Sequence, residues 1–466
     1  MTTSTASSGS TAASDSGLGN GLKTRHLTMM GLGSAIGAGL FLGTGVGIQA
    51  AGPAVLVAYI IAGALVVFVM QMLGEMAAAR PASGSFSTYG RMAYGHWAGF
   101  LLGWLYWFML TMVMGAEMTG AAAIMGEWFG VAPWIPALVA VVFFAILNFA
   151  QVNGFGEFEY WFAMVKVAVI VIFLVISLLL VFGWLPGHDA GGFSNVHSVG
   201  FAPHGLSGIA SGLLAVAFAF GGIELVTIAA AESADPQQSI ATAVRSVMFR
   251  IGVFYIGSVV MIVLLLPYDQ IGAAESAAES PFTQVLALAN IPGAVVIMEA
   301  VIVLALLSAF NAQIYATSRL VHDLAKEGDA PKILANTNAN GVPINGVILS
   351  MIFAFLSVGL QFWNPPGLLN FLLNAVGGCL LVIWVMITLS YLRLHPQLEK
   401  SGEIATVRMW GFPWLAYVVL VLMAGLVILM LTDASARGQV ISVAVVSAVL
   451  LVLGALVQKR SGKTTA

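Results

Sequence analysis

The stretch Gly31-Leu-Gly-Ser-Ala-Ile-Gly-Ala-Gly39, with further glycines up to Gly47, lies in the first long apolar segment of the chain. Glycine disfavours a helix interior by about 1 kcal/mol relative to alanine. This density of glycine therefore suggests an unwound stretch in the middle of a helix. Small residues spaced four apart, such as Gly39 and Gly43, equally suit close packing of two helices. The stretch by itself is compatible with unwinding and with packing.

Composition places this stretch in an integral membrane protein. Of the 466 residues, 60% are hydrophobic and 8% are charged, with a mean hydropathy of +0.98, whereas soluble domains carry about 25% charged residues. These values exclude a soluble domain and a disordered chain, and no basic patch indicates nucleic-acid binding. A spanning helix needs roughly 20 apolar residues. The apolar runs predict an all-α protein with twelve transmembrane helices, at 27–51, 53–79, 97–125, 133–152, 159–185, 205–232, 243–267, 293–318, 341–361, 366–391, 412–432 and 438–457.

The basic residues give the orientation of these spans. Of the 17 Lys and Arg residues, 15 fall in the termini or the even-numbered connections, among which we count Arg250. Arg437 lies in an odd-numbered connection and Lys166 lies within a span. The positive-inside rule then predicts that both termini are cytoplasmic. Residues 1–22 have no basic n-region and are expected to be a disordered cytoplasmic tail rather than a signal peptide; residues 459–466 form a second tail.

A second cluster of glycines, in Phe218-Ala-Phe-Gly-Gly-Ile-Glu224, lies near the middle of the sixth span. Glycine-interrupted helices at corresponding positions of two halves are the best sequence indication of a transporter site. Breaks in the first and sixth spans predict an inverted repeat of five helices plus five, and they favour unwinding over packing. The repeats cover about 27–185 and 205–391 in a core of 23–392, with helices 11 and 12 at 393–458. Freed N–H and carbonyl groups suit a zwitterionic amino acid.

Ionisable residues inside a membrane are candidates for function. Every Asp and His falls in a tail, a connection or a span end, which leaves few within the spans. They are Glu75, Glu117, Glu224, Glu232, Glu299 and Lys166. Three lie near span ends and are expected to be interfacial, with Glu75 pairing with Arg80. Glu117 and Glu224 are deeper and suit either structural hydrogen bonds or proton exchange. Lys166 suits proton coupling, with snorkelling to an interface as the alternative.

A series of motifs runs in order along the chain from residue 23 onward. They are Gly33-Ser-Ala-Ile-Gly-Ala-Gly-Leu-Phe41, Ala51-Gly-Pro53, Gly74-Glu-Met76, Gly84-Ser-Phe-Ser-Thr-Tyr89, Trp104-Leu-Tyr-Trp107, Gly156-Glu-Phe-Glu-Tyr-Trp161, Phe220-Gly-Gly-Ile-Glu224, Ala229-Ala-Ala-Glu-Ser233, Tyr315-Ala-Thr-Ser-Arg319 and Gly328-Asp-Ala-Pro331. Together they resemble the bacterial amino acid permeases of the amino acid–polyamine–organocation superfamily. The resemblance implies a leucine-transporter-type fold with broken helices 1 and 6, in the bacterial inner (plasma) membrane.

The resemblance also implies alternating-access uptake of an amino acid together with protons, in contact with membrane lipid, and without cofactor, metal or enzymatic activity. By the same resemblance, the substrate carboxylate meets backbone N–H groups of the first helix, the ammonium meets carbonyls of both broken helices, and an aromatic ring closes over the substrate. The implied substrate-binding residues are Ser34, Ile36, Gly37, Ala38, Gly39, Glu117, Phe218, Phe220 and Gly221. The residues implied in proton coupling or gating are Lys166, Glu224 and Glu117.

The substrate is indicated by the segment Thr227-Ile-Ala-Ala-Ala-Glu-Ser233, which is similar to the version in 4-aminobutyrate (GABA) permeases. We therefore expect GABA, with neutral or other α-amino acids (proline, alanine, asparagine, aromatic) as the alternative. An amino acid sensor is a reading from another class, although no loop is long enough to fold alone. An intramembrane enzyme is disfavoured because Asp and His are absent from the span interiors. The oligomeric state is left open.

Overall fold

The computed structural model describes residues 36–82, 85–150, 155–185, 200–224, 236–271, 280–338, 341–404, 407–432 and 434–461. Within these ranges the regular structure is helical and no strand occurs. The predicted N-terminal tail, Ser34 and the segment Thr227–Ser233 lie outside the described residues.

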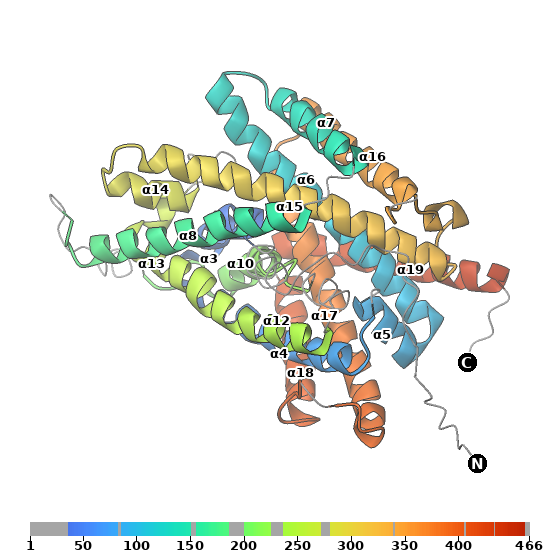
Figure 1. Cartoon of the computed structure of the whole chain (residues 1–466). Coiled ribbons are helices and arrows are strands. Elements are labelled where there is room, and N and C mark those ends of the chain that lie inside the picture. The colour runs from blue at the N-terminus through green and yellow to red at the C-terminus, as the bar shows by residue number, and fades with distance from the viewer. Residues whose placement is uncertain are drawn as a thin grey trace, which may run out of the picture.

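The helices form a bundle in which α3 and α10 lie near the centre and α7, α16 and α19 lie toward the outside (Figure 1). Their bounds are α2 Ala38–Phe41, α3 Gly43–Ala51, η1 Gly52–Ala54, α4 Val55–Ala79, α5 Ser85–Tyr94, α6 His96–Phe129, α7 Trp134–Ala150, α8 Phe155–Val181, α10 Gly205–Ala219, α12 Pro236–Arg250, η2 Ile251–Ile256, α13 Gly257–Leu265, η3 Tyr268–Gln270, α14 Pro281–Leu288, α15 Ala294–Lys326, η4 Lys332–Ala335, α16 Ile344–Trp363, α17 Leu368–Lys400, α18 Trp414–Thr432 and α19 Ala434–Ser461.

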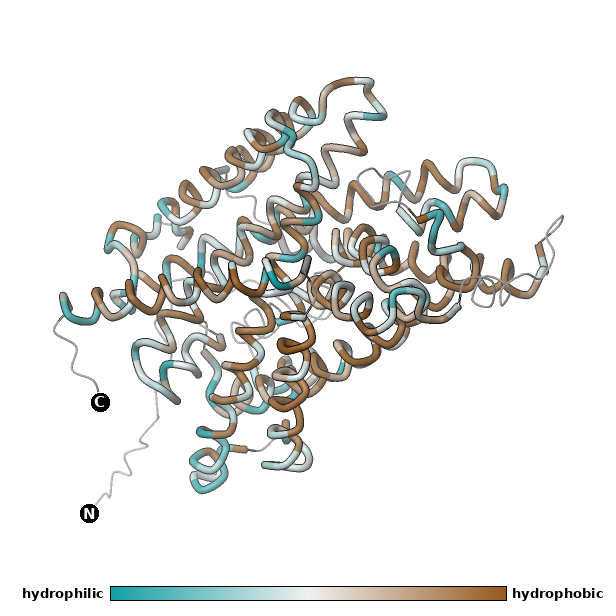
Figure 2. Tube along the Cα trace, turned by 180° about the vertical axis from the view of Figure 1, so that it is seen from behind, coloured by the Kyte–Doolittle hydropathy of each residue, from teal (hydrophilic) through white to brown (hydrophobic). Residues whose placement is uncertain are grey.

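Apolar surface on the outside of this bundle is what a lipid environment requires. In the described part of the chain, nine helical segments are long and apolar enough to cross a membrane, and two shorter apolar helices cover Trp134–Phe149 and Gly205–Ala219. Apolar residues follow most of the helical trace, and hydrophilic residues gather toward helix ends (Figure 2). Large apolar side chains such as Ile172, Val421 and Val452 are exposed. Because water would disfavour so much exposed apolar surface, the fold is that of a multi-pass membrane protein.

Glycines allow α2 and α3 to pack unusually closely against α10. A Cβ atom on Gly39 would lie 2.6 Å from the Cα of Ala219, and one on Gly212 would lie 3.2 Å from the carbonyl oxygen of Gly47. A Cβ on Gly208 would lie 2.6 Å from the carbonyl oxygen of Ala50. No larger side chain fits such backbone contacts without movement. These glycines therefore serve close packing, and the expectation that Gly39 meets the substrate carboxylate stays a prediction.

Helix ends occur inside the bundle at both predicted breaks. Ile36 and Gly37 are not helical, and α2 begins at Ala38. The α10 helix ends at Ala219, and residues 220–224 form turns in which Gly222 has a φ of +88°. A positive φ favours glycine because it has no Cβ atom. Gly37 and Gly222 thus lie in non-helical backbone, whereas Gly39, Gly208 and Gly212 allow helices to pack closely.

Replacement of Gly39 by alanine is expected to lower the stability of the protein by about 1–3 kcal/mol, the usual range for overpacking in a tight core. Thermal unfolding of the purified protein in detergent measures this change. Gly425→Ala in α18 is the matched control, because no atom lies within 4 Å of a Cβ added there. Equal melting temperatures for the two variants would contradict close packing at Gly39.

Candidate functional site

The Glu117 carboxylate from α6 lies at the start of α2. The backbone N–H of Ala38 donates to both carboxylate oxygens, at 3.2 Å to Oε1 and 3.0 Å to Oε2. A Cβ atom on Gly37 would collide with the same carboxylate, so Gly37 leaves the space in which Glu117 lies. A hydrogen bond between a charged acceptor and a backbone N–H stabilises by about 1.5–3 kcal/mol.

This contact puts a carboxylate of the chain at the place where the sequence predicts the carboxylate of the substrate. Glu117 is buried, and Ile36 and Ala38 beside it are also buried. An N–H group that already has an acceptor is open to a second carboxylate only after the first one leaves. The arrangement is therefore suited to an exchange of carboxylates at Ala38.

The end of α10 supplies the other side of the candidate site. The backbone N–H of Gly221 donates to the carbonyl of Phe218 at 2.8 Å and closes the last turn. Phe218 and Phe220 are buried. The ring of Phe220 contacts those of Tyr59, at 5.9 Å between centroids, and Tyr255, at 5.1 Å. We call Tyr59, Phe220 and Tyr255 the aromatic cluster; it lies beside the turn that follows α10.

Lys166 and Glu224, predicted in coupling and gating, are both buried. The ammonium of Lys166 on α8 donates to the hydroxyl of Ser308 on α15 at 3.0 Å, and Lys166 interacts electrostatically with Glu117. The burial of Lys166 excludes snorkelling to an interface. Glu224 accepts the N–H of Gly222 at 3.2 Å and lies beside Tyr106.

The structure thus joins the predicted residues into two groups around the helix ends. Gly37, Ala38, Glu117 and Lys166 form the first group, and Phe218, Phe220, Gly221 and Glu224 form the second. Gly39 connects them through its contact with Ala219. Among the described residues, no group of three or more His, Cys, Asp or Glu side chains is arranged to hold a metal ion.

Three residues near these groups were not expected from the sequence. Tyr59 and Tyr255 belong to the aromatic cluster, and the Tyr255 hydroxyl interacts electrostatically with both Arg250 and Glu117. Arg250, which we placed in a connection, is fully buried where α12 passes into η2. The signal was available, since position 250 lies inside the span predicted at 243–267. Because Arg250 was counted with the basic residues of the connections, it was not recognised as a residue inside the membrane.

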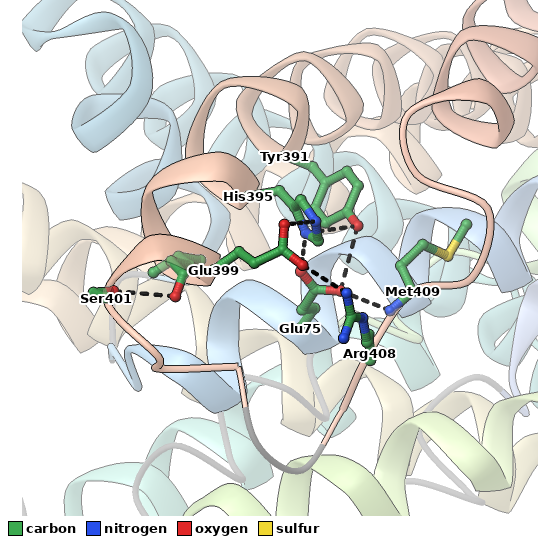
Figure 3. A network of polar contacts seen from close by, with 8 residues as sticks. Glu75, Tyr391, His395, Glu399, Ser401, Arg408 and Met409 are labelled. Atoms are coloured by element: carbon green, nitrogen blue, oxygen red, sulfur yellow. Dashed lines mark hydrogen bonds and ion pairs between the residues drawn. The ribbon is translucent and has the colours of Figure 1, made fainter.

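Glu75 belongs to a separate polar network where α4, α17 and residues 407–413 meet (Figure 3). Its carboxylate accepts hydrogen bonds from the Tyr391 hydroxyl at 3.3 Å and from the Met409 N–H at 2.6 Å, and it contacts His395. Glu75 is fully buried. The expected pairing with Arg80 is therefore wrong, although Glu75 does lie near the end of α4 as expected. The backbone of the segment after α17 satisfies Glu75, and only the tertiary structure reveals this.

Arg80, at the end of α4, pairs instead with Glu403, just after α17. Its guanidinium donates to the two carboxylate oxygens at 2.7 and 2.9 Å. These hydrogen bonds lower the pKa of Glu403 to about 2. With the Glu75 network, this pair joins the ends of α4 and α17 at two neighbouring points.

The bundle, its apolar exterior and the paired helix ends inside it define a membrane protein with a central polar site. A model of the amino acid permease family matches residues 26–461. The chain is 70% identical to the aromatic amino acid transport protein AroP of Corynebacterium glutamicum, over 95% of this chain and 96% of that protein. It is 39% identical to the gamma-aminobutyric acid permease of Bacillus subtilis, over 96% and 95%. It is 34% identical to AroP of Escherichia coli K12, over 94% of each.

The chain therefore belongs to the amino acid permease family of multi-pass membrane transport proteins, and it is not an enzyme. The comparisons do not support GABA as the expected substrate, because the relative at 70% identity is named for aromatic amino acids and the GABA permeases match at about 40%.

Replacement of Glu403 by glutamine is expected to lower thermal stability at pH 7 by a small amount, since the pair with Arg80 is partly exposed. The folded-state pKa of Glu403 is depressed, so its contribution is present above the unfolded value of about 4.3 and is lost as pH falls toward 2. Melting curves of wild type and variant should converge below about pH 4. A difference that stays constant from pH 7 to pH 3 would contradict the pairing. The Arg80→Gln, Glu403→Gln double variant should resemble Glu403→Gln.

Proposed function

We propose that this protein takes up an aromatic amino acid together with protons, by alternating access, across the bacterial plasma membrane. The proposed architecture is twelve transmembrane helices with both termini cytoplasmic. Helices 1–5 and 6–10 form inverted repeats of the leucine-transporter type, and helices 11 and 12 lie outside them. The site lies between the start of α2 and the end of α10.

The observation that carries this proposal is the Glu117 carboxylate on the N–H of Ala38. A backbone N–H at a helix start, enclosed away from water, stabilises a carboxylate. The substrate carboxylate takes the place of Glu117 on Ala38. Carbonyls near Ile36, Phe218 and Gly221 accept the ammonium. Recognition of both charged groups then needs little side-chain charge, in keeping with 8% charged residues.

Two observations support an aromatic side chain on the substrate. The relative at 70% identity is named as an aromatic amino acid transport protein. The aromatic cluster lies beside the turn after α10 and is buried. Aromatic rings favour edge-to-face and offset contacts with one another, so Phe220 and its two tyrosine neighbours offer a suitable lining. Phe220 closes over the bound ring.

Glu117, Lys166 and Glu224 carry the proposed coupling. When the substrate carboxylate displaces Glu117 from Ala38, Glu117 loses its hydrogen bonds inside a low-dielectric site. Binding a proton then removes the unfavourable buried charge. The positive charge of Lys166 offsets the negative charge of Glu117 at the start of α2. At the end of α10, Glu224 exchanges a proton while it contacts the N–H of Gly222.

Uptake into proteoliposomes that contain the purified protein tests the substrate. We expect phenylalanine, tyrosine and tryptophan to be taken up and to compete with one another, while a tenfold excess of GABA leaves phenylalanine uptake unchanged. Uptake should require an inward proton gradient and should collapse with a protonophore. Uptake of GABA in preference to all three aromatic amino acids would overturn the aromatic assignment, and sodium-driven uptake would overturn proton coupling.

Glu117→Gln is expected to separate binding from coupling. Glutamine keeps an acceptor for Ala38 but lacks the charge, so it competes less strongly with the substrate carboxylate. Equilibrium binding of phenylalanine should be as tight as in wild type or tighter, exchange should continue, and the response of net uptake to the proton gradient should be lost. Glu299→Gln is the control, because Glu299 contacts Trp128 at the exposed end of α15. Net uptake by Glu117→Gln that remains coupled to protons would assign the proton to another residue.

A further inference from the structure

Arg250 is the one fully buried arginine in the described ranges of the chain. Its three guanidinium nitrogens have no hydrogen-bond partner among the described residues. Other arginines have partners: Arg80 pairs with Glu403 and Arg408 pairs with Glu399. An arginine stays protonated in proteins and cannot lose its charge as a buried lysine can. A buried, unpaired guanidinium is therefore an exception that needs a physical explanation.

The position of Arg250 is deep in the bundle. The neighbouring Ile251 side chain would lie 2.9 Å from a Cβ on Gly63 of α4, whereas Val244 packs against Gly74, nearer the end of that helix. Gly63 lies about 12 Å along α4 from its start, at a rise of 1.5 Å per residue. The hydrocarbon core of a membrane is about 30 Å thick. Arg250 therefore lies well inside the membrane and not at an interface.

Arg250 is also connected to the candidate site. A Cβ on Gly63 would be 3.7 Å from the Phe220 ring as well as 2.9 Å from Ile251. The Tyr255 hydroxyl interacts electrostatically with both Arg250 and Glu117. Both the guanidinium and the Glu117 carboxylate thus lie within electrostatic reach of Tyr255, a buried member of the aromatic cluster.

The backbone at Arg250 departs from the α-helix. Arg250 precedes the π-helical segment η2, Ile251–Ile256, which contains Tyr255. π-Helical turns are rare and frequently occur at functional sites. Gly252 lies on the exposed side of this turn, where an added Cβ atom would meet no atom within 4 Å. A local rearrangement of η2 offers a way to open Arg250 to a ligand.

We propose that Arg250 forms a second carboxylate-binding position, next to the aromatic cluster, which the carboxylate occupies after it leaves Ala38. The planar guanidinium suits a carboxylate because it donates two parallel hydrogen bonds. Intramembrane arginines characteristically mark the pathways of substrates and ions. The carboxylate belongs to the amino acid as it moves toward the side of the membrane where α12 begins. The chain's own Glu117 is the second source of the same chemistry.

This inference rests on the proposed function, and one set of variants tests it in full-length protein in proteoliposomes. Arg250→Met removes the charge, Arg250→Lys keeps it without the planar fork, and Arg245→Met is the control on the exposed face of α12. Binding of radiolabelled phenylalanine to Arg250→Met should stay within about twofold of wild type. Uptake and exchange should fall about tenfold or more, the size of a lost charge-assisted hydrogen bond. Arg250→Lys should recover part of this loss, and Arg245→Met should behave as wild type.

The source of the carboxylate is distinguished by repeating Arg250→Met in the Glu117→Gln background, with exchange of phenylalanine as the readout. If Arg250→Met lowers exchange by the same factor in this background as in wild type, the position binds the substrate carboxylate. If Arg250→Met causes no further loss of exchange, the position binds Glu117. Either result supports a carboxylate position at Arg250.

Two results would overturn the proposal. The first is exchange by Arg250→Met within twofold of wild type. The second is an equal loss of binding and exchange in Arg250→Met and Arg250→Gln, which would make Arg250 purely structural; Arg250→Gln also serves if Arg250→Met does not fold. Failure of the proposed function itself is recognised separately, because wild-type protein would then take up no aromatic amino acid.

Discussion

The close contact between the first apolar segment and α10 is the interaction on which the rest of the site depends. Glycines at 39, 208 and 212 let the two backbones touch, with the Cα of Ala219 directly against Gly39. Because side chains are absent from this contact, the start of α2 and the end of α10 lie next to each other inside the bundle. In a membrane such helix ends need polar partners, and two helix ends with unsatisfied backbone groups form a polar centre. Any larger residue in the contact would separate the two ends.

The polar partners come from helices that pack around this contact. Glu117 on α6 reaches the N–H of Ala38, and Glu224 reaches the N–H of Gly222. Lys166 on α8 donates to Ser308 on α15. These three buried groups therefore each have a defined partner, as the low dielectric of a membrane interior demands. The Arg250 guanidinium has no hydrogen-bond partner among the described residues, which suits a binding step that is completed in another conformation.

Charges at the ends of the helices have a different role. Arg80 with Glu403, and Glu75 with Tyr391 and Met409, connect α4 to α17 and to the segment that follows it. The sequence placed Glu75 near a span end correctly but assigned it the wrong partner, because Arg80 is close in sequence while Glu403 and Met409 are close only in space. For the same reason Arg250 was assigned to a connection. Its burial depends on the packing of α12 against α4, which the sequence does not specify.

The sequence by itself determined the class of protein, because 60% hydrophobic residues with 8% charged residues require lipid around the chain. It also indicated that helices start or end within the first and sixth predicted spans, since glycine disfavours helix, and it named Glu117, Lys166 and Glu224 as the deep groups. Only the tertiary structure decided which glycines pack and which unwind, and that Glu117 already holds Ala38. It alone brought Tyr59, Phe220 and Tyr255 together and buried Arg250. These are contacts between residues far apart in the chain, and side-chain chemistry at one position does not specify the position that faces it.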